Sequence, residues 1–126
     1  MSSTANFAPS EDPGKEMKER LRSDLRSALK DRRTDEAKVL RTLVSAIDNA
    51  EAPPLSAEQA VSAPHQFQSG SAEVERLRLS RSRLRQLLLA EIREREQAAA
   101  KFERLDQTDR AQALRAEVSV ARRYLA

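Results

Sequence analysis

The spacing of apolar residues constrains this fold more than any other feature of the sequence. In four separate stretches, apolar side chains recur three or four positions apart, which places them on one face of an α-helix. Four helices with one apolar face each need one another to form a core. The four stripes are Met17, Leu21, Leu25 and Ala28 or Leu29; Leu40, Leu43, Val44 and Ile47; Leu84, Leu87, Leu88, Ile92, Ala98 or Ala99 and Phe102; and Ala111, Leu114, Val118, Ala121 and Leu125.

Capping residues predict where the first pair of helices begins and turns. Asp12 can accept hydrogen bonds from the first free amides, and Pro13 suits the first helical position. Residues 31–33 are polar and form the turn. Thr34 is the expected N-cap of the second helix, with two acids directly after it.

A proline-containing stretch separates the two halves of the chain. The pair Pro53-Pro54 ends the second helix near Glu51, because proline cannot continue a helix. Residues 52–79 hold three of the five prolines and little apolar periodicity, so we expect a mobile linker. Ser80 is the expected N-cap of the third helix.

The second pair of helices turns at residues 105–107, where Thr108 or Asp106 caps the fourth helix. Residues 1–11 are small and polar and include a proline, which predicts a disordered tail. The sequence therefore predicts one all-α domain over residues 12–126, a small four-helix bundle of two helical hairpins.

Several absences in the composition exclude common catalytic chemistry. The chain has no cysteine, which excludes thiol nucleophiles, disulfides and Cys-based zinc sites. Its one histidine, His65, has no nearby acid in the sequence to orient the ring. The two glycines do not form a phosphate-binding loop, and the acids of the third helix lack the Glu-x-x-His pairing of bundle metal sites. We therefore expect no catalytic residue, no cofactor and no metal.

The sequence also contains no membrane signal. No apolar run approaches the roughly 20 residues that cross a bilayer, and the N-terminus lacks a basic region followed by a hydrophobic one. We expect a cytoplasmic protein without a membrane partner.

Five arginines around the start of the third helix are the candidate nucleic-acid-binding residues. No acid interrupts them, and guanidinium groups position a phosphate backbone without reading bases. RNA contact is one interpretation; a solvated helix start in an arginine-rich chain is the other. The five are Arg76, Arg78, Arg81, Arg83 and Arg85.

Two further groups of polar residues have a pattern. Glu91 and Arg95 are four positions apart within the apolar stripe of the third helix, which predicts a half-buried ion pair that fixes how the hairpins dock. Its possible partners are Glu117 and Tyr124. A polar strip on the second helix is a candidate partner-docking face or an ordinary solvated one: Arg41, Ser45, Asp48 and Asn49.

The ordered set of motifs resembles the GatB/YqeY-like family. Similar runs cover residues 15–51 and about 84–125, and the strongest are residues 24–31 (DLRSALKD), 39–51 (VLRTLVSAIDNAE), 90–95 (AEIRER), 109–111 (DRA) and 123–125 (RYL), with Phe102 and Glu117. Departures are Asp106-Gln107, where the family usually has Gly-Arg, Ala126 in place of a closing proline, and the lack of the family's second helical domain.

The resemblance implies an accessory role. The related region forms the C-terminal part of the subunit of the Glu-tRNA and Asp-tRNA amidotransferase that helps to hold tRNA, while other domains carry the chemistry. We therefore expect a non-catalytic binding module associated with tRNA or an RNA-containing complex and linked to glutamine-dependent tRNA amidation. The alternatives are a protein-protein adaptor without nucleic acid, and the family label of a carbon-nitrogen ligase with glutamine as amido-N-donor.

Overall fold

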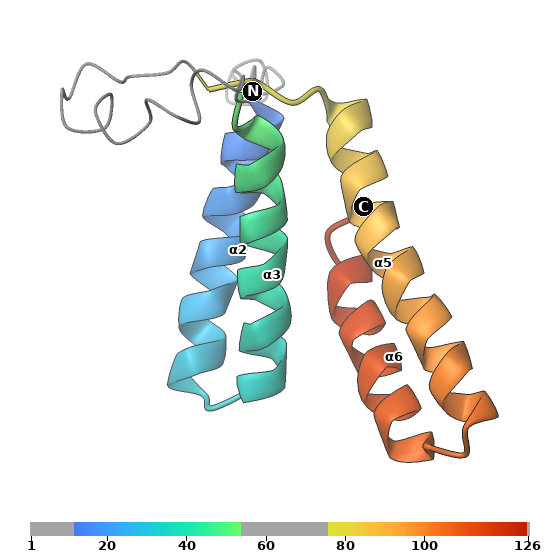
Figure 1. Cartoon of the computed structure of the whole chain (residues 1–126). Coiled ribbons are helices and arrows are strands. Elements are labelled where there is room, and N and C mark those ends of the chain that lie inside the picture. Colours follow the sequence, from blue (N-terminus) through green and yellow to red (C-terminus); the bar gives the residue numbers. More distant parts are fainter. Residues whose placement is uncertain (1–11, 54–75, 126) are drawn as a thin grey trace, which may run out of the picture.

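A computed structural model describes residues 12–53 and 76–125, which form four helices and no strand (Figure 1). α2 packs against α3, and α5 packs against α6, so each half is a helical hairpin. The all-α fold of two hairpins is thereby confirmed. The predicted tail, residues 1–11, and the central part of the predicted linker, residues 54–75, lie outside the described residues. The helices are α2 (Pro13–Lys30), α3 (Thr34–Glu51), α5 (Arg81–Arg104) and α6 (Thr108–Arg122).

Two of the predicted helix starts are confirmed in detail. The Asp12 carboxylate accepts a hydrogen bond from the Lys15 amide at 3.1 Å, and Pro13 occupies the first helical position of α2. At α5, the Ser80 hydroxyl oxygen accepts from the Arg83 amide at 3.0 Å. Each cap satisfies one of the amides that a helix start leaves unpaired.

The two hairpins turn in the same way. Arg32 and Asp106 both adopt the left-handed conformation, each with φ of 59°. In the first turn, the Arg33 amide donates to the Ala28 carbonyl at 2.8 Å. In the second, the Gln107 amide donates to the Phe102 carbonyl at 2.8 Å. This is the Schellman arrangement, which pairs the last carbonyls of the preceding helix.

The predicted N-caps of α3 and α6 are wrong by one residue. The N-caps are Arg33 and Gln107, and neither side chain makes a capping hydrogen bond. The turns explain the difference, because the residue that closes each Schellman arrangement is also the N-cap of the next helix. Thr34 and Thr108 therefore stand at the first helical position, and Asp106 stands inside the turn.

The hairpins stand side by side with both turns at the same end (Figure 1). The core between them contains residues from every predicted stripe. Its largest fully buried apolar side chains are Leu21, Leu40, Leu43, Ile47, Leu88 and Val39. Leu79, in the segment without regular secondary structure before α5, is also buried in this core, so the prediction of a mobile linker does not hold for residues 76–79. None of the described helices is long and apolar enough to span a bilayer.

Candidate nucleic-acid interface

The structure divides the five predicted arginines into groups with different surroundings. Arg76 donates to the Glu51 carboxylate at 2.7 Å and to the Asp12 carboxylate. The hydrogen bond between Arg76 and Asp12 raises the pKa of Arg76 and lowers that of Asp12. Arg76 is therefore held by two acids within the chain, and it is the least suited of the five to contact RNA.

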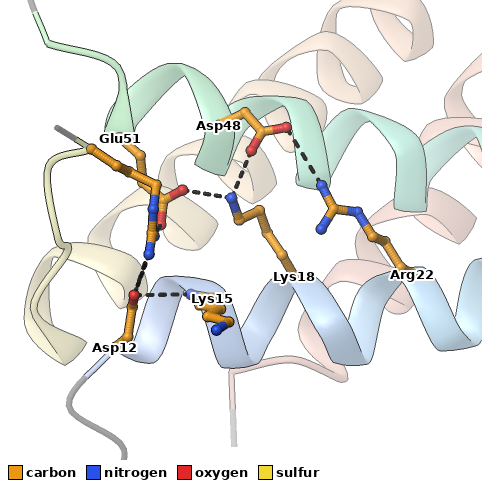
Figure 2. Close-up of polar contacts among 7 residues, drawn as sticks. Asp12, Lys15, Lys18, Arg22, Asp48 and Glu51 are labelled. Carbon is orange, nitrogen blue, oxygen red and sulfur yellow. Dashed lines mark hydrogen bonds and ion pairs between the residues drawn. The ribbon is translucent and has the colours of Figure 1, made fainter. Parts of the chain in front are cut away.

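Glu51 is the centre of an ion-pair cluster at this end of the first hairpin (Figure 2). Its side chain is 2 % exposed, and its Oε1 lies 2.6 Å from the Lys18 Nζ. Lys18 also lies 2.7 Å from Asp48 Oδ1. Burial disfavours the charged lysine, but its hydrogen bonds to Asp48 and Glu51 outweigh this effect and raise its pKa. Both buried charges are thus paired, as burial requires.

The cluster fixes the segment that leads into α5. Arg76 joins this segment to Glu51 at the end of α3, and the neighbouring Leu77 amide donates to the Glu51 backbone carbonyl at 2.8 Å. Gly14 leaves room for the Glu51 carboxylate, because a β-carbon at that position would overlap Glu51 Oε2. These contacts hold the start of α5 against the end of the first hairpin.

The pairing of Lys18 with Glu51 was not predicted from the sequence, although the apolar spacing contains its signal. Lys18 is three residues before Leu21, and Glu51 is four residues after Ile47. Both charged residues therefore continue an apolar stripe by one helical turn, where a charge must find a partner.

The other four arginines lie at the beginning of α5 or just before it. Arg78, Arg81 and Arg83 are exposed, and their guanidinium groups make no hydrogen bond or ion pair with another described residue. The charge of Arg78 does help to lower the pKa of Asp12, after the larger effect of Arg76. Arg85 is also exposed, but its guanidinium donates to the Leu125 carbonyl at 2.9 Å. The candidate interface is thus centred on Arg78, Arg81 and Arg83, with Arg85 beside them.

The charge at the start of α5 opposes the helix dipole. Its first turn contains no acid, whereas α2, α3 and α6 each have at least one acid there. Arg81 and Arg83 occupy the first and third positions of α5. Positive charge at the positive end of a helix is unfavourable, and an anion is stabilised there.

The predicted docking strip on α3 likewise contains both paired and unpaired side chains. Arg41, Ser45 and Asn49 are exposed, as a docking face requires, and so is Asp48. Asp48, however, pairs with Lys18 and lies 3.9 Å from an Arg22 nitrogen (Figure 2). The strip stays a prediction with three available members.

Glu91 and Arg95 form an ion pair at 2.9 Å, and Arg95 donates to Glu117 of α6 at 2.9 Å. Burial disfavours charge on Arg95, but hydrogen bonds to Glu91 and Glu117 outweigh it and raise the pKa of Arg95. These contacts join α5 to α6 within the second hairpin, so the half-buried ion pair is confirmed but the prediction that it fixes how the two hairpins dock is wrong. The suggested partner Tyr124 instead donates to Asp24 of α2 at 2.6 Å.

Within the two described ranges, no group of three or more acids and histidines is placed to hold a metal. Comparison of the chain with protein-family models, with curated proteins and with solved structures found no match. The resemblance to the GatB/YqeY-like family therefore stays a prediction, carried by the residues that suggested it.

Proposed function

We propose that this chain is a non-catalytic binding module that contacts the phosphate backbone of RNA through Arg78, Arg81 and Arg83. The observation that carries the proposal is the charge at the start of α5. Among the described helices, α5 is the one whose first turn has arginines and no acid. A phosphate at this place would relieve the repulsion between arginines and meet the helix dipole.

The resemblance to the GatB/YqeY-like family favours tRNA as the RNA. The proposed role is to hold tRNA, alone or in an RNA-containing complex, for glutamine-dependent amidation. The carbon-nitrogen ligase label would then describe a complex with other domains. In this proposal the chain itself supplies binding and orientation.

The test is fluorescence anisotropy of labelled tRNA with the full chain at several salt concentrations. Three phosphate contacts predict that affinity falls about 20- to 40-fold between about 50 and 200 mM salt. The double variant Arg78→Glu/Arg83→Glu should weaken binding and reduce the slope of log affinity against log salt by about two. Neither residue pairs with another described residue, so we expect the variant to fold.

A matched control separates a local site from the effect of net charge. Arg26→Glu/Arg93→Glu makes the same change of charge at two exposed positions elsewhere on α2 and α5. We expect it to keep most of the affinity and the salt slope. Equal losses in both double variants, or no binding of tRNA at low salt, would contradict the proposal.

A further inference from the structure

A groove of about 260 Å³ lies beside the first turns of α5, between α2 and the residues that follow α6. Its floor is apolar, with Leu84, Leu88 and Tyr124 buried and Met17 and Leu125 half-buried. Two exposed arginines, Arg81 and Arg85, complete the lining. We refer to this feature as the α5 groove.

The charge of the α5 groove favours an anionic occupant. No acid lines it. The Arg81 guanidinium makes no hydrogen bond or ion pair with another described residue, and the Arg85 guanidinium uses one of its N–H groups on the Leu125 carbonyl. A guanidinium has five N–H donors, so both arginines can still bind a carboxylate or a phosphate.

The apolar floor favours an occupant that also carries an apolar group. A cavity of about 260 Å³ is smaller than most sites for cofactors and drug-sized ligands. Its size suits one large side chain, the usual anchor at the centre of a protein-protein interface. A bare phosphate backbone would leave this floor unused.

A nucleobase does not fit the floor, because the groove offers no aromatic face for stacking. Tyr124 is its one aromatic lining residue and is 2 % exposed. The Arg20 guanidinium lies 4.7 Å from the centre of the Tyr124 ring, and the Tyr124 hydroxyl donates to Asp24. The observations therefore favour a protein segment over RNA at this place.

We propose that the α5 groove binds an acidic segment of a partner protein. One large apolar side chain of the segment rests on Met17, Leu84 and Leu125, and its neighbouring carboxylates pair with Arg81 and Arg85. This surface goes beyond the proposed RNA contact, which also uses Arg78 and Arg83, two residues outside the groove. Arg81 belongs to both surfaces, so the segment and RNA compete for it.

The test is fluorescence anisotropy with two labelled twelve-residue peptides of equal negative charge. One peptide has a phenylalanine flanked by Asp and Glu, and the other has serine in its place. We expect the phenylalanine peptide to bind the full chain at least about tenfold more tightly, because one large apolar side chain is buried. No binding of the phenylalanine peptide, or equal binding of both peptides, would overturn the proposal.

Variants show whether the groove is the site of binding. Arg81→Gln/Arg85→Gln should lower the affinity for the phenylalanine peptide at least about tenfold. Arg78→Gln/Arg83→Gln removes the same charge outside the groove and should change this affinity less than about twofold. Leu125→Ser should reduce the preference for phenylalanine over serine. Equal effects of the two arginine variants would indicate general attraction and overturn the proposal. Circular dichroism checks that each variant is folded.

The tRNA measurement distinguishes this inference from the proposed function. Loss of tRNA binding in Arg78→Glu/Arg83→Glu, with the phenylalanine peptide still bound, supports two surfaces. Binding of the peptide without any binding of tRNA would contradict the proposed function and leave the α5 groove supported. An unlabelled oligouridine that displaces the phenylalanine peptide from the wild-type chain supports competition at Arg81. Failure of the oligouridine to displace the peptide, at a concentration that saturates the chain with RNA, contradicts that competition.

Discussion

At Gly14, the space normally taken by a side chain is occupied by the Glu51 carboxylate. Glycine to alanine in a helix usually stabilises by about 0.5–1 kcal/mol. Here the new methyl would push Glu51 away from Lys18 and Arg76, and disruption of a buried ion pair costs about 3–5 kcal/mol. We predict that Gly14→Ala lowers the free energy of unfolding by about 1–3 kcal/mol because Glu51 can partly move.

Urea denaturation measures this difference, and Lys15→Ala is the control on the same helical turn. The Lys15 side chain is exposed, so its replacement should change the free energy of unfolding by less than about 0.5 kcal/mol. An increase in stability for Gly14→Ala would show that the Glu51 carboxylate is not confined by its partners.

Arg83 occupies the position at which a capping box has glutamate. The Ser80 oxygen already accepts from the Arg83 amide, and a glutamate at position 83 could accept from the Ser80 amide in return. Such a carboxylate would also meet the positive end of α5. We predict that Arg83→Glu raises the free energy of unfolding by about 1 kcal/mol. Urea denaturation tests it, and a less stable variant would contradict the capping argument.

The same substitution should weaken tRNA binding, so stability and function change in opposite directions at this residue. Arg83→Gln separates the two contributions, because glutamine can complete the capping box without the charge. We expect an intermediate gain in stability from it. Under the proposed function, this opposition is the physical reason for an unfavourable residue at the start of α5.

Between the helices, the two Schellman turns have different strain although both central residues have φ of 59°. Left-handed geometry costs an ordinary residue about 1–2 kcal/mol, and aspartate tolerates it better than arginine. Relief of this strain is partly offset because glycine has more conformational freedom in the unfolded chain. We therefore predict that Arg32→Gly raises the free energy of unfolding by about 0.5–1 kcal/mol. Asp106→Gly should stabilise less. Thermal and urea unfolding measure both.

Arg32→Ala is the control for the backbone argument, because alanine keeps the β-carbon that causes the strain. It should leave stability nearly unchanged. If alanine stabilised as much as glycine, the gain would come from loss of the arginine side chain.

The helices were predictable because their signals are local. Apolar residues three and four positions apart place all four helices, and the residue types at Asp12 and Ser80 identify two of the caps. The remaining caps were missed because a single residue both closes a turn and is the N-cap of the next helix. Preferred residue types at helix ends do not show when one residue has both roles.

The surroundings of the arginines depend on contacts between distant parts of the chain. Arg76 meets Asp12 across 64 positions, and Arg85 meets Leu125 across 40. Sequence spacing identified the arginines as a group, but only the packing of the hairpins shows which guanidinium groups already have partners. The same holds for the α5 groove, whose lining comes from three separate segments.

For the whole molecule, Tyr124 connects the second hairpin to the first. Its hydroxyl donates to Asp24 of α2 across 100 positions, and its ring is buried. Burial, followed by the hydrogen bond to Asp24 and the charge of that carboxylate, raises the pKa of Tyr124 well above its ordinary value of about 10. The folded protein therefore keeps the hydroxyl protonated at a pH at which the unfolded chain loses the proton.

The difference between the folded and unfolded pKa of Tyr124 determines how stability changes at alkaline pH. Because the folded pKa is raised, the contribution of Tyr124 to stability is full below about pH 10 and is lost as the pH rises toward the folded pKa. The chain has one tyrosine and no tryptophan, so the near-ultraviolet absorbance of tyrosinate reports Tyr124 directly. We predict that tyrosinate appears near pH 10 in urea and at clearly higher pH in the folded protein. Asp24→Asn should lower the folded transition without abolishing it, since burial remains. Identical transitions in the folded and unfolded chains would mean that the hydroxyl is open to solvent and that this contact does not join the hairpins.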